Sequence, residues 1–194
     1  MSISRLPLAV IGMPGAGKSE VTDVLVEVHG FERVYFGQVV LDELARRKFA
    51  PGTESEQLVR EELRASEGMG VMAERSLPRI QAALTRGHDV CVDGLYSGAE
   101  WKLLARETGV ITLAVHAPRW LRKSRLAARA VRPLTGIELD ARDLAEVDQL
   151  DKAKPIALAD AHLVNDGSLD DLRERVDSIL EYLAWVAAAR IHEP

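Results

Sequence analysis

The segment Gly12-Met-Pro-Gly-Ala-Gly-Lys-Ser19 constrains the fold more than any other part of this 194-residue chain. It follows the apolar run Leu6–Ile11 and precedes a run with helical character. The spacing G-x-x-x-x-G-K-S in this position is typical of a strand, a phosphate-binding loop and a helix. Gly15 and Gly17 allow a tight turn whose N–H groups point at phosphate oxygens. The following helix adds the positive end of its dipole.

Each position of the loop has an expected role toward a nucleoside triphosphate. Lys18 reaches the β- and γ-phosphates, and the Ser19 hydroxyl binds Mg²⁺. A chance glycine turn followed by Lys-Ser would not explain both the strand context and the full spacing. We expect the ATP-binding residues to be Gly12, Pro14, Gly15, Ala16, Gly17, Lys18, Ser19, Glu20, Arg125 and Asn165.

Runs with strand character alternate with helical runs along the chain. The predicted strands are Leu6–Ile11, Arg33–Phe36, Asp89–Asp93, Val110–His116 and Ala161–Asn165. The predicted helices are Lys18–Val28, Gln38–Lys48, Glu54–Arg86 (interrupted around Gly68-Met-Gly70), Ala99–Glu107, Pro118–Ala130, Leu139–Leu150 and Leu169–Ala189. This alternation predicts an α/β fold with a parallel sheet covered on both faces. Ligands then bind at the carboxyl ends of the strands.

Composition limits the class of protein. The apolar fraction of 47% and the length predict one domain over residues 1–194. A formal net charge of −5 makes nucleic acid a poor main partner. We expect no signal peptide and no membrane span, because no apolar run approaches 18 residues. Cys91 is the only cysteine, which excludes an internal disulfide and fits the cytoplasm.

Asp93 ends an apolar strand next to the predicted loop. A carboxylate in this position can hold Mg²⁺ together with Ser19, or act as a base toward an acceptor. The alternative is a strand-terminal Asp-Gly turn. Because Gly94 follows, the sequence lacks the water-activating glutamate of a mechanical ATPase at that position. The five histidines are scattered without metal-ligand spacing.

A basic segment runs from Pro118 to Arg132. Four of its arginines, at 122, 125, 129 and 132, recur at three- and four-residue steps, so we expect them on one helical face. Such a face suits the charge of a transferred phosphoryl group. The alternative is a solvated basic face beside the acidic segment Glu138–Asp151. With the loop tip at Pro133-Leu-Thr-Gly136, residues of about 119–142 could form a mobile lid that expels water.

Other polar residues are candidates for the acceptor or the base of the nucleotide. Arg60 or Arg64 could hold a phosphate of the acceptor, or both could belong to a solvated helix face with internal ion pairs. Tyr96 could touch the acceptor or have no catalytic role. Asn165 begins Asn-Asp-Gly, which could wrap the base or be a plain turn.

The chain resembles the phosphate-loop nucleotide and nucleoside kinase superfamily, and more narrowly the small adenylate-kinase-like and dephospho-CoA-kinase-like proteins of archaea and some bacteria. The matching pieces cover most of the chain in order: Gly12–Ser19, Phe36–Val40, Val92–Ser97, Arg122–Arg129, Arg142-Asp143 with Glu146, and Ala159–Asn165. The resemblance implies a three-layer P-loop fold with a five-stranded parallel core, a short helical lid, and phosphate transfer from ATP.

By this resemblance Lys18 holds the phosphates, Ser19 holds the magnesium, and Arg125 and Arg129 make lid contacts. Such kinases often carry an acidic residue where Gln38 stands, so this chain departs from their pattern at a position expected to bind the acceptor. The catalytic set is therefore expected to be Lys18, Asp93, Arg125 and Arg129, and the acceptor set Gln38, Arg60, Arg64 and Tyr96.

Three candidate functions are considered for a chain with these motifs. The first is an ATP- and Mg²⁺-dependent kinase for a nucleoside monophosphate, a nucleoside or dephospho-CoA. The second is an ATP-binding regulatory module or weak ATPase without acceptor phosphorylation, since fold does not determine function. The third, a GTPase switch, lacks the expected guanine-reading motif. The expected partners are ATP and a small molecule, with neither nucleic acid nor membrane, in a monomer or a homodimer.

Overall fold

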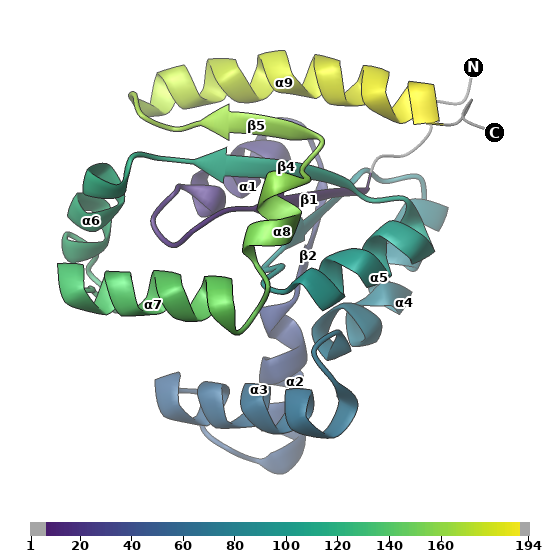
Figure 1. Ribbon diagram of the computed structural model, residues 1–194. Helices are drawn as coiled ribbons and strands as arrows, with labels where there is room; N and C mark the ends of the chain where they lie inside the picture. The colour runs from purple at the N-terminus through teal and green to yellow at the C-terminus, as the bar shows by residue number, and fades with distance from the viewer. Residues whose placement is uncertain (1–6, 191–194) are drawn as a thin grey trace.

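The computed structural model describes residues 7–190, which contain a five-stranded sheet in the order β2-β3-β1-β4-β5 (Figure 1). All neighbouring strands are parallel, as the sequence predicts. The strands are β1 (Pro7–Ile11), β2 (Glu32–Tyr35), β3 (Val90–Asp93), β4 (Ile111–His116) and β5 (Ala161–Val164). The central strand β1 therefore delivers the glycine loop to the middle of the carboxyl edge.

Helices occupy both faces of the sheet and its carboxyl edge. They are α1 (Lys18–Glu27), α2 (Gly37–Arg47), α3 (Thr53–Glu67), α4 (Val71–Thr85), α5 (Gly98–Thr108), α6 (Arg119–Ala127), α7 (Gly136–Asp148), α8 (Ala153–Ala157) and α9 (Leu169–Arg190). The predicted interruption of the long middle helix is confirmed, because residues Gly68–Gly70 are not helical and separate α3 from α4. None of the helices within the described residues is long and apolar enough to cross a membrane.

The alternation of side chains along the strands builds a core on each face of the sheet. Ala9, Ile11 and Val92 face α2, α4 and α5, whereas Leu8 and Val10 face α1 and α9. Strands buried on both faces need apolar residues at every position, which explains the unbroken apolar runs in the sequence. The described part of the chain thus has the three layers that the sequence predicts.

Local capping signals determine where several helices begin. Ser97 and Glu100 form a reciprocal capping box at the start of α5, and Thr135 and Glu138 form another at the start of α7. Ser168 accepts a hydrogen bond from the N–H of Asp171 at the start of α9, which is the usual role of a serine N-cap. These caps satisfy N–H groups that have no partner within their helix.

The structure differs from the sequence-based expectation at two places after β4. The helix expected over Pro118–Ala130 ends at Ala127, because Leu126 is its last buried apolar side chain and the N–H of Leu134 donates to the Leu126 carbonyl at 3.2 Å. The short helix α8 was not expected, since its five residues carry no periodic pattern. The chain instead folds back after α6, and α7 runs beside it at the carboxyl edge (Figure 1).

Candidate active site

The loop between β1 and α1 has the backbone conformation of a phosphate cradle. Gly12, Gly15 and Gly17 all have positive φ, at 154°, 77° and 96°. Space is also limiting: a Cβ at Gly12 would lie 2.3 Å from the carbonyl oxygen of Val115, and one at Gly17 would lie 2.0 Å from Nδ2 of Asn165. The glycines are therefore required by conformation and by the close approach of β4 and of the segment after β5.

The loop offers unpaired donors to an anion. Within residues 7–190, the backbone N–H groups of Gly15, Gly17, Lys18 and Ser19 have no hydrogen-bond acceptor. They lie at the N-terminus of α1, where the helix dipole is positive. Free N–H groups gathered in a turn before a helix form an anion site.

The side chain of Lys18 is held inside this loop. Its Nζ donates to the carbonyl oxygens of Gly12 at 2.9 Å and Met13 at 3.1 Å. Burial, followed by the nearby charge of Lys152, lowers the pKa of Lys18 to about 7. A bound phosphate would raise the pKa of Lys18 again, because its negative charge would stabilise the ammonium.

Side chains from two distant segments, α6 and the residues after β5, support the loop from outside. Arg122 of α6 donates to the carbonyl oxygen of Pro14 at 3.0 Å. Asn165, directly after β5, donates to the carbonyl oxygen of Ala16 at 3.0 Å. Arg125 in turn donates to the backbone and side-chain oxygens of Asn165. The structure therefore brings the predicted residues Arg125 and Asn165 to the loop.

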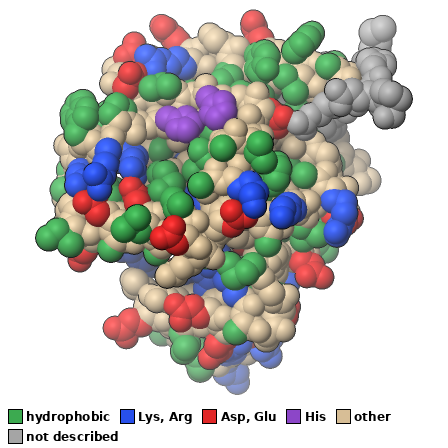
Figure 2. Space-filling view, viewed as in Figure 1, with side chains coloured by type: hydrophobic (Ala, Val, Ile, Leu, Met, Phe, Trp, Pro, Cys, Tyr) green, Lys and Arg blue, Asp and Glu red, His purple; other side chains and the backbone are tan. Residues whose placement is uncertain are grey.

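The expectation of one arginine face over four residues is wrong. Because α6 ends at Ala127, Arg129 lies outside the helix, and its exposed side chain has no described partner. Arg132 pairs with Glu56 of α3 at 3.3 Å. The first half of the basic segment is instead balanced by α7, through Arg122 with Asp143, and through Arg119 and Lys123 with Asp140. Figure 2 shows basic and acidic side chains interleaved over this region.

Asp93 lies at the end of β3 beside the loop and is paired with an arginine that the sequence analysis missed. Arg33 donates to Oδ2 of Asp93 through Nε at 3.1 Å and through Nη2 at 2.5 Å. Oδ1 of Asp93 and the hydroxyl of Ser19 have no described partner. These two oxygens fit Mg²⁺, which binds few protein oxygens and completes its shell with phosphate and water.

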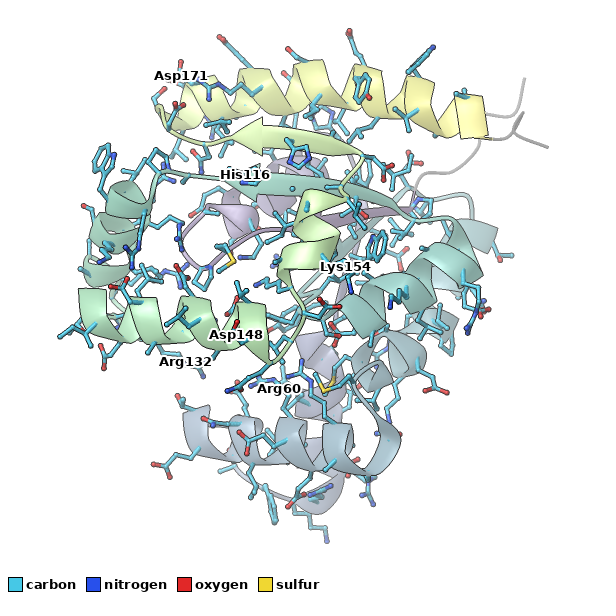
Figure 3. The ribbon with its side chains drawn as sticks, viewed as in Figure 1. Arg60, His116, Arg132, Asp148, Lys154 and Asp171 are labelled. Carbon is cyan, nitrogen blue, oxygen red and sulfur yellow. The ribbon has the colours of Figure 1, made fainter. Side chains whose placement is uncertain are left out.

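The predicted acceptor residues do not form one group. Gln38, in the first turn of α2, donates to Asp42 and lines a cavity of about 410 Å³ between β2 and α4. Arg60 extends from α3 and has no partner among the described residues (Figure 3). Arg64 is largely buried and faces Glu100 of α5 at 3.6 Å. Arg64 Nε and Glu100 Oε1 are both buried without a hydrogen-bond partner in the described part of the chain.

Tyr96 joins a charged cluster at the end of α7. Its ring lies 4.6 Å from Nζ of Lys152, which is fully buried and ion-paired with Glu146. Glu146 also accepts from Nε of Arg142 at 2.9 Å. Burial tends to raise the pKa of Glu146, but Lys152 and Arg142 outweigh it and lower that pKa overall. Because Tyr96 follows Asp93 by three residues, the cluster lies near the carboxyl end of β3.

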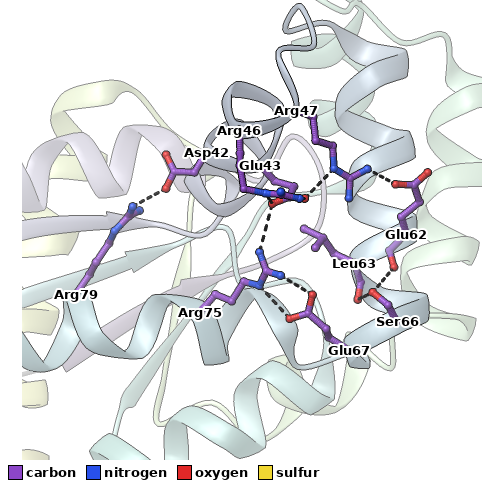
Figure 4. Close-up of polar contacts among 10 residues, drawn as sticks. All are labelled: Asp42, Glu43, Arg46, Arg47, Glu62, Leu63, Ser66, Glu67, Arg75 and Arg79. Carbon is purple, nitrogen blue, oxygen red and sulfur yellow. Dashed lines mark hydrogen bonds and ion pairs between the residues drawn. The ribbon is translucent and has the colours of Figure 1, made fainter.

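The segment of α2, α3 and α4 is held by a separate network of ion pairs (Figure 4). Glu43, buried on α2, accepts from Arg46 and Arg47 and faces Arg75 of α4 at 3.7 Å. Arg47 also pairs with Glu62 of α3. The hydrogen bonds from the two arginines of α2 lower the pKa of Glu43 to about 2. The ion pairs expected within the middle helix are thus made mostly between helices.

The sequence predicts no role for Arg33 or Lys152. Arg33 lies in a strand where a charged residue reads as an exposed position, and only the pairing of β2 with β3 brings it to Asp93. Lys152 follows a turn without periodicity. One local signal existed for its neighbours, because Arg142 and Glu146 are four residues apart on a helix.

Comparisons with known proteins agree with this geometry. A family model described as an AAA domain matches residues 11–138. The UPF0200 protein of Aeropyrum pernix is 36% identical over 173 residues, covering 88% of this chain and 90% of that protein. The UPF0200 protein of Methanothrix thermoacetophila is 34% identical over 182 residues, covering 91% of this chain and 97% of that protein.

Solved structures show the same fold at low sequence identity. TT1252 from Thermus thermophilus has a TM-score of 0.65 at 21% identity and covers 92% of this chain and 98% of its own. A gluconokinase from Sinorhizobium meliloti has a TM-score of 0.59 at 15% identity, covering 97% and 99%. A dephospho-CoA kinase from Campylobacter jejuni has a TM-score of 0.53 at 15% identity, covering 92% and 97%. The fold is thus that of P-loop kinases, and the chain belongs to the family of the UPF0200 proteins and carries the matched AAA domain.

Proposed function

We propose that this protein is an ATP-dependent phosphotransferase that moves the γ-phosphoryl group of ATP to a small nucleotide-like acceptor, namely a nucleoside monophosphate, a nucleoside or dephospho-CoA. The observation that carries the proposal is the loop at Gly12–Ser19, with its unpaired N–H groups and Lys18 beside further cations. The kinase fold of structural neighbours supports it, although their low identity speaks only for the fold.

Each site residue has its own role in the proposed phosphoryl transfer. In the transfer, an oxygen of the acceptor bonds to the γ-phosphorus, the bond to the bridging oxygen breaks, and ADP leaves. Lys18 and the loop N–H groups hold the phosphates, and Asp93 faces the acceptor oxygen as base or magnesium ligand. Ser19 and Asp93 would hold Mg²⁺, which screens the phosphate charge when bound. The lid over residues 119–142 would bring Arg125 and Arg129 to the nucleotide.

The acceptor would enter between α3 and the end of α7. Arg60 and Arg64 point to an acceptor with its own negative charge, since Arg60 has no described partner and Arg64 only a distant one. Tyr96 completes this proposed acceptor set, whereas Gln38 lines a separate cavity between β2 and α4. The buried, unpaired Cys91 agrees with a reaction in a reducing compartment such as the cytoplasm.

The test is a phosphoryl-transfer screen with ATP labelled on the γ-phosphate. Nucleoside monophosphates, nucleosides and dephospho-CoA are supplied one by one, with Lys18→Ala as the matched control. We expect Lys18-dependent labelling of one acceptor. Labelling that is equal in the Lys18→Ala protein would contradict the proposal.

The contact between Arg33 and Asp93 supports a second candidate function. The double hydrogen bond of Arg33 to Asp93 ties up one oxygen of the carboxylate that the transfer needs. An ATP-binding regulatory module or a weak ATPase would tolerate this pairing. ATP binding without labelling of any acceptor, with wild-type protein, would favour this second function.

A further inference from the structure

Lys152, directly before α8, is a buried lysine whose contacts do not match an ordinary structural ion pair. Its side chain is 0% exposed. Glu146 is its single hydrogen-bond acceptor among the described residues, and the ring of Tyr96 covers another side of the ammonium. An ammonium has three donors, so one carboxylate oxygen leaves the group under-satisfied in a buried position.

The carboxylate partner of Lys152 is shared with a second cation. Glu146 accepts from Arg142 at Oε1 and from Lys152 at Oε2. The terminal nitrogens of Arg142 have no partner in the described part of the chain. A buried ammonium with unused donors is unfavourable unless a further acceptor, such as an anion, joins it.

A well-ordered turn determines the position of Lys152. The carbonyl oxygen of Leu150 accepts from the N–H of Gly98 at 3.1 Å. Asp151 adopts a left-handed conformation with φ of 51°, and its carboxylate lies so close to Gly98 that a Cβ there would come within 2.6 Å. The turn is therefore packed against the start of α5, which places the lysine toward Tyr96 and the loop.

We propose that Lys152 is a phosphate-binding residue that contacts the γ-phosphoryl group of the bound nucleotide, giving up part of its pairing with Glu146. This inference rests on the proposed function. The γ-phosphate is the group concerned because Lys152 packs on Tyr96, three residues after Asp93 at the carboxyl end of β3, where the proposed transfer takes place. A second lysine at the phosphoryl group, besides Lys18, would stabilise the charge of its transition state.

The experiment compares affinities for MgATP and MgADP by calorimetry, because only the γ-phosphate distinguishes the two ligands. Lys152→Met removes the charge and keeps the length of the side chain. We expect its affinity for MgATP to fall about tenfold while its affinity for MgADP stays within about twofold. Lys154→Met is the matched control, since Lys154 is a half-exposed lysine two residues away on α8 and pairs with Asp151 (Figure 3). It should change neither affinity.

A second variant tests the same inference if Lys152→Met does not fold. Glu146→Gln releases Lys152 and Arg142 from their carboxylate, so the ratio of MgATP to MgADP affinity should rise above the wild-type ratio. A merely structural ion pair predicts an unchanged ratio in both variants, and that result would overturn the inference while leaving the proposed function intact. Wild-type protein that binds neither nucleotide would instead overturn the proposed function itself.

Discussion

The helices α2 to α4 and the segment around the glycine loop are both rich in charge, but they balance it differently. In the first region, Arg46, Arg47 and Arg75 each have a carboxylate partner, centred on the buried Glu43. Around the loop, two cations share Glu146, and backbone N–H groups are left without acceptors. The ion pairs of α2 to α4 satisfy one another and stabilise the fold. The free N–H groups and the cations around the loop can instead bind an anion.

The largest effect is expected from Lys18→Ala. The variant removes the cation that the loop presents to the phosphates, so phosphoryl transfer should fall by at least about 100-fold. Its thermal unfolding midpoint should stay close to the wild-type value, because Lys18 makes hydrogen bonds only to the loop itself. Transfer rates and unfolding curves of the same preparation check both statements, and a large loss of stability would count against the distinction between the two regions.

Glu43→Gln should instead lower the stability of the protein and leave nucleotide binding nearly unchanged. The change leaves arginines of α2 and α4 without their shared buried carboxylate, so the unfolding midpoint should drop by about 3–6 °C. The affinity for MgATP should remain within about twofold, since the network lies outside the loop. Scanning calorimetry and nucleotide titration measure the two quantities. A tenfold loss of MgATP affinity would mean that the two regions are coupled.

The same carboxylate predicts a pH dependence. The folded-state pKa of Glu43 is about 2, below its ordinary value of 4.5, so its stabilising effect is fully present above pH 4.5 and is lost as the pH falls toward 2. Between these values, the wild-type protein should lose stability more steeply than Glu43→Gln, which has nothing to titrate at this position. Denaturant unfolding at several acidic pH values measures the two slopes. Parallel slopes would contradict the assignment.

The smallest effect is expected from Arg79→Ala. Arg79 pairs with Asp42 at 2.5 Å, but both side chains are about half exposed. Exposed pairs contribute little, so the free energy of unfolding should change by less than about 0.5 kcal/mol. Chemical denaturation measures this difference, and the variant is a matched control for Glu43→Gln. A loss as large as that of Glu43→Gln would show that burial does not separate the two pairs.

Much of the fold follows from the sequence for local reasons. The order of strands and helices and the interruption at Gly68–Gly70 depend on neighbouring residues, so periodicity and turn residues predict them. The end of α6 could not be predicted in this way. It depends on how far Leu126 is buried and on Leu134, which bonds back to it after a loop.

In the candidate site, too, local features could be predicted from the sequence and long-range contacts could not. The glycine loop is a continuous motif whose geometry could be expected residue by residue. The contacts of Arg33 with Asp93 and of Lys152 with Tyr96 join residues about 60 positions apart, and they exist only because strands pair and a turn packs against α5. No local pattern carries that information.

A crystal structure with Mg²⁺ and a non-hydrolysable ATP analogue tests the nucleotide site most directly. We predict that the phosphates lie on the N–H groups of Gly15, Gly17, Lys18 and Ser19, and that Nζ of Lys18 leaves the carbonyl oxygens of the loop for the β- and γ-phosphates. An analogue that binds elsewhere, with Lys18 still on the carbonyl oxygens of Gly12 and Met13, would contradict this assignment.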